Sequence, residues 1–406
     1  MAVRLEDELK AYARSIGLDA VGIAAAGPFA PERDVLLDRQ ARGLRTTFEE
    51  PDVELRTDPQ RLLPGARSIV AVGVSYLSRA HVPGARDGES GADGPRGFLS
   101  RYCRGPDYHV YLRERLRLLA AWLAARVPGA RTYAFADTEP PIDRAVAERA
   151  GLGFYGRSGL LISPVYGTWL FLGGLLTDVQ LEPDPPWHGT CGNCTRCVDA
   201  CPTGAIIEDG VVDPRRCLSY VTQMKGSLPE DLREPLGNMI FGCDVCQDVC
   251  PYNRRPSVRA GDHPELSALP QVGGDDGPLL AELIRLSPAT FRSTYARTAA
   301  GWRGKTVLQR NAAVALGNSR DPRAVPLLAE ALGNPSPVVR AHAAWALGRL
   351  AAALPDLAPE VREILEQALA TETEPAVRQA LSKAANDAKT PAGTAGETPV
   401  RPGGPG

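Results

Sequence analysis

The cysteines are the residues whose type and spacing most clearly indicate chemistry. Eight of the nine lie between Cys191 and Cys250. The run CGNCTRCVDACP (191–202) has the spacing C-x2-C-x2-C-x3-C-P, which is typical of proteins that bind two four-iron, four-sulfur clusters. A second run, CDVCQDVCP (243–251), has the same ending but carries Ile240 where a first cysteine would stand. Cys217 is the one unassigned thiol nearby and fills this gap.

The fourth cysteine of such a run binds the neighbouring cluster in two-cluster ferredoxins. The two runs therefore predict one ligand set for each cluster. The first cluster takes Cys191, Cys194, Cys197 and Cys250, and the second takes Cys201, Cys217, Cys243 and Cys246.

Structural zinc is the alternative use of these thiols. Zinc sites employ separated pairs of ligands, often with histidine, and need four ligands per ion. Here three cysteines fall within residues 191–197, and both runs end in Cys-Pro. Iron–sulfur clusters therefore fit better, and Cys103 is left without a cluster role. The five histidines (His81, His109, His188, His263 and His342) show no ligand spacing and are expected to be ordinary loop or helix residues.

Composition places the chain among globular proteins and limits its partners. The chain has 406 residues, 44% of them hydrophobic and 23% charged, with a net charge of −2. Its N-terminal sequence is charged and amphipathic, without an apolar signal region or twin arginines, and the longest apolar stretch (159–176) is interrupted by Ser, Pro and Gly. We expect a cytoplasmic protein that does not enter a membrane, and a monomer.

Residues 1–180 are expected to position the chemistry as an α/β or α+β domain. Helical spacing predicts helices over 6–16, 107–126 and 141–150. Apolar, β-branched stretches predict strands over 68–76 and 131–136 and two buried strands within 159–176. Residues 79–97 are polar and glycine-rich, which predicts a loop.

The rest of the chain is expected to form four further parts. Residues 181–258 lack apolar periodicity and would form a ferredoxin-like domain held together by its clusters. A linker with helical connections (259–300) leads to 301–386, where RNAAVALG (310–317) recurs as HAAWALG (342–348). Helical pairs repeated in this way are typical of HEAT-like repeats, with an ordinary helical bundle as the alternative. A Pro/Gly-rich tail (387–406) is expected to be disordered.

The blocks that flank the cysteine runs carry a resemblance over residues 1 to about 385. The chain resembles the epoxyqueuosine reductases, cobalamin-dependent enzymes of tRNA modification. The matching blocks are FEEPDVELRTDPQRLLPGARSIV (48–70), RGPDYHVYLRERL (104–116), DTEPPIDRAVAERAGLGFYGRSGLLISPVYGTWLFLG (137–173), RRCLSYVTQMKG (215–226), GNMIFGCDVCQDVCPYN (237–253) and GWRGKTVLQRNAAVAL (301–316).

The resemblance implies a reaction and a second cofactor. The reaction is reduction of the epoxide of epoxyqueuosine at the wobble position of tRNA, which yields queuosine and water. Electrons from an external donor would pass through the clusters to a base-off cobalamin. Positions similar to those that touch the corrinoid are Arg56, Ser100, Asp137, Leu161 and Ser219. The D-x-H-x-x-G signature of histidine-ligated corrinoids is absent, since the nearest string, DYHVYL (107–112), lacks the glycine.

Asp137 corresponds by resemblance to the proton donor of the family. Its position before Thr138 and two prolines would also suit the cap of a helix. A carboxyl group with an ordinary pKa near 4 is ionised at neutral pH. We therefore expect burial against the corrin and residues 160–162 to raise the pKa of Asp137.

A basic segment is the expected contact for tRNA. Residues 302–350 carry seven Lys/Arg against two acidic residues, a net charge of +5 in a chain of net −2. Such a segment suits an RNA backbone, although charged runs are often merely solvated. The predicted contacts are Lys225, Arg303, Lys305 and Arg310.

Two other functions compete with the tRNA enzyme. One is a reductive-dehalogenase-like corrinoid enzyme that acts on a small molecule. The other is a non-catalytic electron-transfer module whose repeats dock a protein partner.

Overall fold

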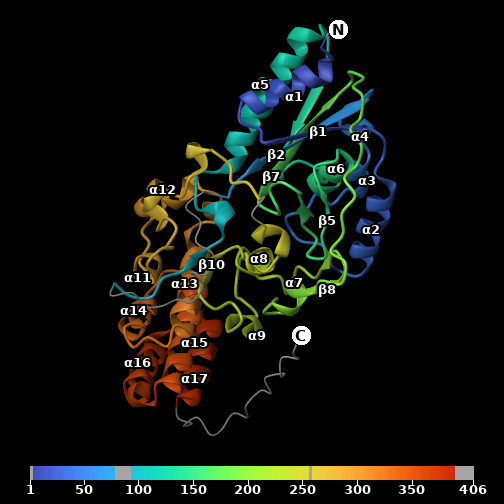
Figure 1. Ribbon diagram of the computed structural model, residues 1–406. Coiled ribbons are helices and arrows are strands. Elements are labelled where there is room, and N and C mark those ends of the chain that lie inside the picture. The colour runs from blue at the N-terminus through green and yellow to red at the C-terminus, as the bar shows by residue number, and fades with distance from the viewer. Residues whose placement is uncertain (1–2, 78–92, 256–257, 389–406) are drawn as a thin grey trace.

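A four-stranded antiparallel sheet is the frame of the N-terminal part of the computed structural model, which describes residues 3–77, 93–255 and 258–388 (Figure 1). The order is β1 (Ala20–Ala25), β2 (Ser68–Ser75), β7 (Leu170–Thr177) and β4 (Thr132–Phe135). All eight residues of β2 are buried, as expected of a central strand covered on both faces. At Gly174 on β7 an added Cβ would lie 2.4 Å from the ring of Phe135, so glycine allows this close approach.

Helices cover both faces of this sheet. Helix α5 (Tyr108–Arg126) and α1 (Leu5–Ser15) pack with β2 and β7 in the largest hydrophobic core, and α6 (Asp143–Arg149) packs on the other face. Asp107 caps α5, because its Oδ1 accepts a hydrogen bond from the His109 backbone N–H. The remaining elements here are α2 (Ala30–Ala41), α3 (Val53–Thr57), α4 (Pro59–Leu62), β3 (Phe98–Leu99), β5 (Phe154–Tyr155) and β6 (Leu161–Ile162).

The cysteine-rich part has only short elements, in line with its lack of apolar periodicity. They are α7 (Arg196–Asp199), β8 (Ile206–Glu208), β9 (Val211–Val212), α8 (Leu218–Val221), α9 (Glu230–Arg233), β10 (Met239–Phe241) and α10 (Val245–Asp248). Strand β10 pairs in parallel with β3, which ties this part to the N-terminal part. In Figure 1, α8 lies between the sheet and the C-terminal helices.

The C-terminal helices stack as the internal repeat predicts. After α11 (Leu280–Ile284) and α12 (Pro288–Ser293) come α13 (Lys305–Asn318), α14 (Ala324–Ala331), α15 (Pro337–Ala353), α16 (Ala358–Thr371) and α17 (Pro375–Asp387). The repeated glycine of each copy lies at a helix crossing. An added Cβ at Gly317 would lie 2.8 Å from Ala346, and one at Gly348 would lie 3.0 Å from Ala384. Small residues therefore let α13, α15 and α17 approach closely.

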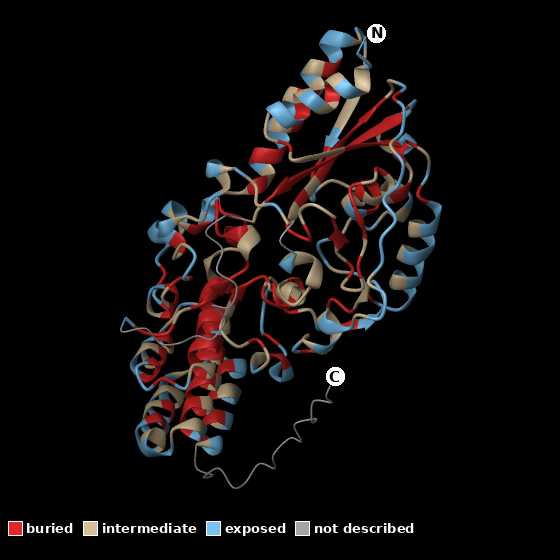
Figure 2. Ribbon diagram, in the orientation of Figure 1, coloured by how far each residue is buried: buried red, intermediate tan, exposed pale blue. Residues whose placement is uncertain are grey.

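Helix α13 is buried along most of its length and joins the repeats to the rest of the molecule (Figure 2). One hydrophobic core runs from β2 and α5 through α11 to α13 and α15, and a smaller one joins α8 and α9 to Val314. Helix α17 extends to Asp387, the residue at which the sequence predicted that the tail begins. The tail from residue 389 on, His81 and most of the predicted 79–97 loop lie outside the described residues. Among the described helices, none has both the length and the apolar character needed to cross a membrane.

Candidate active site

Cys217 and the seven cysteines of the two runs are all half-buried. Burial raises the pKa of Cys250, and so do the nearby charges of Cys191 and Cys194. Burial likewise raises the pKa of Cys246, with contributions from Cys243 and Cys217, and Cys201 acts on Cys217 in the same way. Cys191, Cys194 and Cys250 belong to one predicted ligand set, and Cys201, Cys217, Cys243 and Cys246 belong to the other. Cys197 of the first set also raises the pKa of Cys246, so the division into two sets stays a prediction.

The backbone around these thiols suits anionic sulfur. The Arg157 N–H lies 3.4 Å from Cys191 Sγ, and the Ala205 N–H lies 3.3 Å from Cys201 Sγ. Burial raises the pKa of Cys201, but hydrogen bonds from the backbone of Thr203 and Ala205 outweigh it, so this pKa is lowered. Amide hydrogen bonds to sulfur are one of the means by which proteins hold and tune iron–sulfur clusters, and the residues present fit that use.

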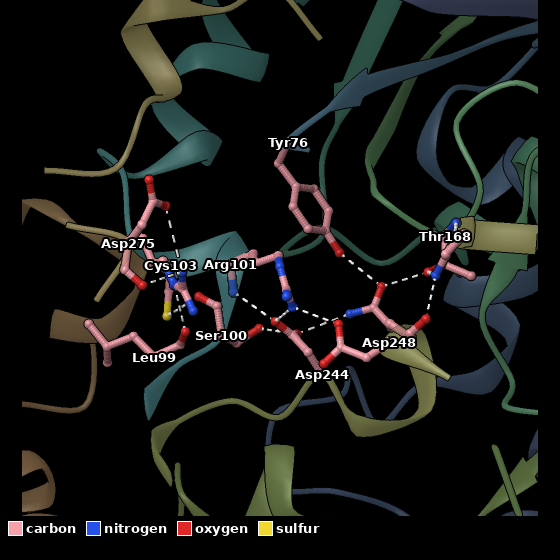
Figure 3. Close-up of polar contacts among 12 residues, drawn as sticks. Tyr76, Leu99, Ser100, Arg101, Cys103, Thr168, Asp244, Asp248 and Asp275 are labelled. Carbon is pink, nitrogen blue, oxygen red and sulfur yellow. Dashed lines mark hydrogen bonds and ion pairs between the residues drawn. The ribbon is translucent and has the colours of Figure 1, made fainter. Parts of the chain in front are cut away.

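A buried charged network fastens the second cysteine run to the N-terminal part (Figure 3). Arg101 Nη1 lies 2.9 Å from both Asp244 Oδ2 and Asp248 Oδ1, and the Asp244 side chain has no exposed surface. Gln247 continues the network, since its Oε1 accepts hydrogen bonds from the hydroxyls of Tyr76 and Thr168. Breaking a buried pair leaves an uncompensated charge, so these contacts hold the cysteine loop in one position.

Ser100, a predicted corrinoid contact, belongs to this network instead. Its Oγ donates to Asp244 Oδ1 at 2.5 Å, its N–H donates to the Phe241 carbonyl, and its own carbonyl accepts from Cys103. Only 1% of Ser100 is exposed. Because every polar atom of this residue is used internally, we withdraw Ser100 as a cofactor contact.

Cys103 is a core residue in this structure. It is fully buried, and its Sγ donates to the Ser100 carbonyl at 3.1 Å. Burial raises the pKa of the Cys103 thiol far above its usual range. An inert, protonated thiol agrees with its exclusion from the two ligand sets.

Asp137 lies at the end of a hydrogen-bonded group that also contains Tyr108, His109 and Asp107. Its Oδ2 accepts a hydrogen bond from the Tyr108 hydroxyl at 2.9 Å and lies 3.2 Å from His109 Nε2. The other ring nitrogen of His109, Nδ1, lies 2.6 Å from Asp107 Oδ1. The Asp137 side chain is 61% exposed, whereas that of His109 is 16% exposed. The carboxylate thus faces solvent, and the less exposed imidazole contacts it from the protein side.

The expected rise in the pKa of Asp137 is wrong for this structure. The surrounding protein does act to raise the pKa, but the hydrogen bond and charge of His109 and the Tyr108 hydroxyl outweigh it and lower the pKa. For His109, burial acts to lower the pKa, and its bonds to Asp107 and Asp137 outweigh it and raise the pKa to about 9. At neutral pH the proton therefore resides on His109, and the two groups titrate as a coupled pair.

The backbone at Asp137 is held in a sparsely populated conformation. Its φ is +59°, in the left-handed region that non-glycine residues seldom adopt. Its N–H donates to Asp143 Oδ2 at 3.1 Å, and the other oxygen of Asp143 is buried without a hydrogen-bond partner among the described residues. Burial and the charge of Asp137 raise the pKa of Asp143 well above its ordinary value. Such geometry is found at functional sites, and it argues against a simple helix cap, because the residue that caps α6 is Ile142.

The other predicted cofactor residues differ in how accessible their side chains are. Arg56 Nη1 is bonded to Glu49 Oε2 at 2.9 Å, with both side chains mostly buried. Ser219 is half-buried on α8, two residues after Cys217, and Leu161 is 5% exposed on β6. Asp137, Arg56 and Ser219 therefore retain accessible surface for a ligand, and the Leu161 side chain is covered.

The predicted tRNA contacts separate into exposed and buried residues. Lys225 is exposed, Arg303 and Lys305 are half-exposed, and within the described parts of the chain none of the three forms an ion pair. Arg310 is fully buried on α13, where its guanidinium donates to the carbonyls of Thr222, Met224 and Gly226. A guanidinium used in this way cannot meet a phosphate, so the prediction for Arg310 is corrected to a structural role.

Charge pairing also reduces the basic character predicted for residues 302–350. Arg323 binds Asp321, Arg340 binds Glu372, and Arg349 binds Glu234. Lys225 and Arg303 line one hollow of about 280 Å³, and Lys305 precedes Thr306, another of its lining residues. Arg310 also lines the hollow, but its guanidinium is held by the carbonyls of residues 222–226.

Sequence reasoning missed the partners of Asp137. His109 was expected to be an ordinary helix residue, and otherwise Tyr108 and His109 were noted only because DYHVYL lacks a corrinoid-ligand glycine. The signal available was the Asp-x-His spacing at a predicted helix start, where a carboxylate can orient an imidazole. Nothing in the sequence pointed to Asp143 or Arg101, since both act across separate segments.

Three family models match parts of the chain. Residues 56–138 match "Epoxyqueuosine reductase QueG, DUF1730", residues 190–253 match the "4Fe-4S double cluster binding domain", and residues 304–386 match "HEAT repeats". The second match spans all eight cysteines, which supports iron–sulfur clusters in place of zinc.

Relatives of known identity match over most of the chain. The epoxyqueuosine reductase of Bacillus cereus is 41% identical over 86% of this chain and 89% of its own, and that of Escherichia coli is 34% identical over 85% and 89%. A solved epoxyqueuosine reductase, crystallised with an epoxyqueuosine-modified stem loop of a tyrosine tRNA, is 39% identical with a TM-score of 0.87 and covers 95% of this chain and 99% of its own. The chain therefore belongs to the epoxyqueuosine reductase family.

Proposed function

We propose that this protein reduces epoxyqueuosine to queuosine at the wobble position of tRNA. The observation that carries the proposal is the Asp107–His109–Asp137 group, which presents a proton in a chain that also carries two cysteine sets that suit iron–sulfur clusters. Opening the epoxide consumes two electrons and two protons, and the oxygen leaves as water. A reducing centre and a positioned acid are the two parts that this balance requires.

The acid is the coupled pair rather than Asp137 alone. His109, held by Asp107, carries the proton at neutral pH, and the Asp137 carboxylate faces solvent. As the carbon–oxygen bond breaks, a proton that passes from His109 Nε2 to Asp137 Oδ2 and on to the substrate oxygen avoids release of an alkoxide. Tyr108 orients the same carboxylate oxygen and supplies a further donor.

Cobalamin is the second cofactor that the family implies, and part of the predicted set fits it. Asp137, Arg56 and Ser219 have accessible surface, and Leu161 would contribute only through its backbone. When bound, cobalamin would supply a low-potential cobalt centre between the clusters and the substrate. The electrons enter from an external donor.

The tRNA backbone is held, in this proposal, by Lys225, Arg303 and Lys305. Each phosphate contact releases counterions and steepens the salt dependence of binding. Charge reversal at all three positions should weaken tRNA binding and flatten that dependence. Arg362→Glu is the matched control, because Arg362 is exposed on α16 outside this surface.

The decisive experiment is turnover under anaerobic conditions. Protein reconstituted with iron, sulfide and cobalamin is incubated with a strong reductant and tRNA that carries epoxyqueuosine, and the nucleosides are measured by mass spectrometry. Formation of queuosine is expected. Fully loaded protein that binds the tRNA and forms no queuosine would contradict the proposal.

A further inference from the structure

Three aromatic side chains from separate segments meet at the surface near the hollow. We call Phe48, Tyr220 and Trp302 the aromatic shelf. The Phe48 ring lies 4.9 Å from that of Tyr220 and 4.9 Å from that of Trp302, between ring centroids. Phe48 is 36% exposed and Trp302 is 54% exposed, which is unusual for large apolar residues. The shelf therefore offers exposed aromatic surface.

Polar contacts hold these exposed rings in place. Trp302 Nε1 donates to Gln223 Oε1 at 3.0 Å, and Arg303 Nε donates to the Gln223 carbonyl at 2.8 Å. The Arg303 guanidinium lies 4.9 Å from the centre of the Phe48 ring and 4.5 Å from that of Trp302. The rings are thus fixed before any ligand arrives, which lowers the entropic cost of binding.

A chain of side-chain contacts links the shelf to Asp137. Gln223 Nε2 donates to the Tyr102 hydroxyl at 3.3 Å, and the Tyr102 ring lies 6.4 Å from that of Tyr108. The Tyr108 hydroxyl in turn donates to Asp137. Side-chain contacts therefore connect the shelf to the Asp137 site.

The side chains of the aromatic shelf and its surroundings favour one kind of ligand. Arg303 beside the rings and Lys225 at the adjacent hollow attract an anion, and flat exposed rings stack on the face of a base. A base that reaches Asp137 must leave the stack of its loop, so that a neighbouring base loses a stacking partner. We propose that Trp302 stacks on an unpaired base of the tRNA next to the modified nucleotide, while the Phe48 ring, at 77° to that of Trp302, contacts the edge of the same base. This inference rests on the proposed function and names a subsite for its substrate.

The test compares two exposed tryptophans. Trp302→Ala and Phe48→Ala remove shelf rings, and Trp187→Ala removes a tryptophan of 47% exposure on the segment before Cys191. Stacking on one aromatic side chain implies roughly 5- to 150-fold weaker binding of the stem loop when the ring is lost. Trp187→Ala should bind as the wild type does, and Trp302→Phe should recover most of the affinity. Binding is measured by fluorescence anisotropy with the fully loaded protein.

A second readout reports stacking itself. A stem loop that carries 2-aminopurine beside the wobble position should be quenched by wild-type protein and not by Trp302→Ala. The salt slope of binding should stay unchanged in Trp302→Ala, because no phosphate contact is lost. Iron content and circular dichroism verify that each variant is folded.

The outcomes separate this inference from the proposed function. If wild-type protein neither binds nor reduces the tRNA, the proposed function fails. If the wild type binds and turns over, and Trp302→Ala and Phe48→Ala match Trp187→Ala in affinity and quenching, the inference is overturned. Two other outcomes also overturn the inference, and in both Trp302→Ala keeps its affinity for tRNA. In the first, the variant loses cobalamin. In the second, it loses only the turnover that a protein electron donor supports, which would mean that the shelf serves another partner.

Discussion

The two cysteine sets and the Asp137 site obtain their geometry from different sources. Seven of the eight predicted cluster ligands lie in two short runs, 191–201 and 243–250, so the spacing along the chain places most sulfurs near their partners. The groups at Asp137 come from two segments about thirty residues apart, and they meet because α5 packs beside β4 and β7. A short-range motif can be recognised by its spacing, whereas the chemical state of an isolated carboxylate depends on its tertiary neighbours.

The largest expected effect on turnover comes from replacing Asp137. Asp137→Asn keeps the shape of the side chain and removes the carboxylate that passes the proton from His109 to the substrate, so turnover should fall by about 10²–10⁴-fold. Iron and cobalamin contents should remain those of the wild type. Near-normal turnover of the loaded variant, measured by single-turnover kinetics under anaerobic conditions, would return Asp137 to a structural role.

The next effect tests whether His109 holds the proton. The raised pKa of about 9 means that wild-type turnover should decline as the pH rises through about 9, where His109 loses its proton. In His109→Gln that limb should disappear. The pKa of Asp137 should then rise, because a hydrogen-bonded positive charge is lost, and the remaining activity should fall with pH at a lower value. A pH–rate profile identical to that of the wild type would show that Asp137 acts without this partner.

A smaller effect distinguishes two arginines of the same basic segment. Arg310→Met leaves buried carbonyls of residues 222–226 without a donor, so unfolding free energy should fall by about 1.5–3 kcal/mol. Arg303→Met removes a half-exposed cation and should cost less than about 1 kcal/mol. Urea unfolding of reconstituted protein measures both. Equal losses, or weaker tRNA binding only in Arg310→Met, would contradict this division.

The smallest effect is expected at the cysteine outside the runs. Cys103→Ser should leave about eight iron atoms per chain, because both predicted ligand sets are already complete. Cys217→Ser, by contrast, should lose about half of the iron. Iron analysis after anaerobic reconstitution distinguishes them, and an equal loss in Cys103→Ser would mean that one of the eight assignments is wrong.

The sequence by itself determined the features that depend on local order. The Cys-Pro runs indicated two clusters, the recurrence at 310 and 342 predicted the stacked helices, and β2, β4 and α5 were expected within a residue or two of their bounds. In each case the signal is a spacing or a periodicity of neighbouring residues, and local geometry is enough to produce it.

Only the tertiary structure decided the charge states and accessibilities. Arg303 and Arg310 are seven residues apart in one basic segment, yet one flanks the aromatic shelf and the other is buried against carbonyls of residues 222–226. Asp137 was expected to have a raised pKa and has a lowered one, because His109 and Tyr108 supply hydrogen bonds from another segment. The pKa and the exposure of a side chain depend on groups within a few ångströms, and for these residues the groups are distant in sequence.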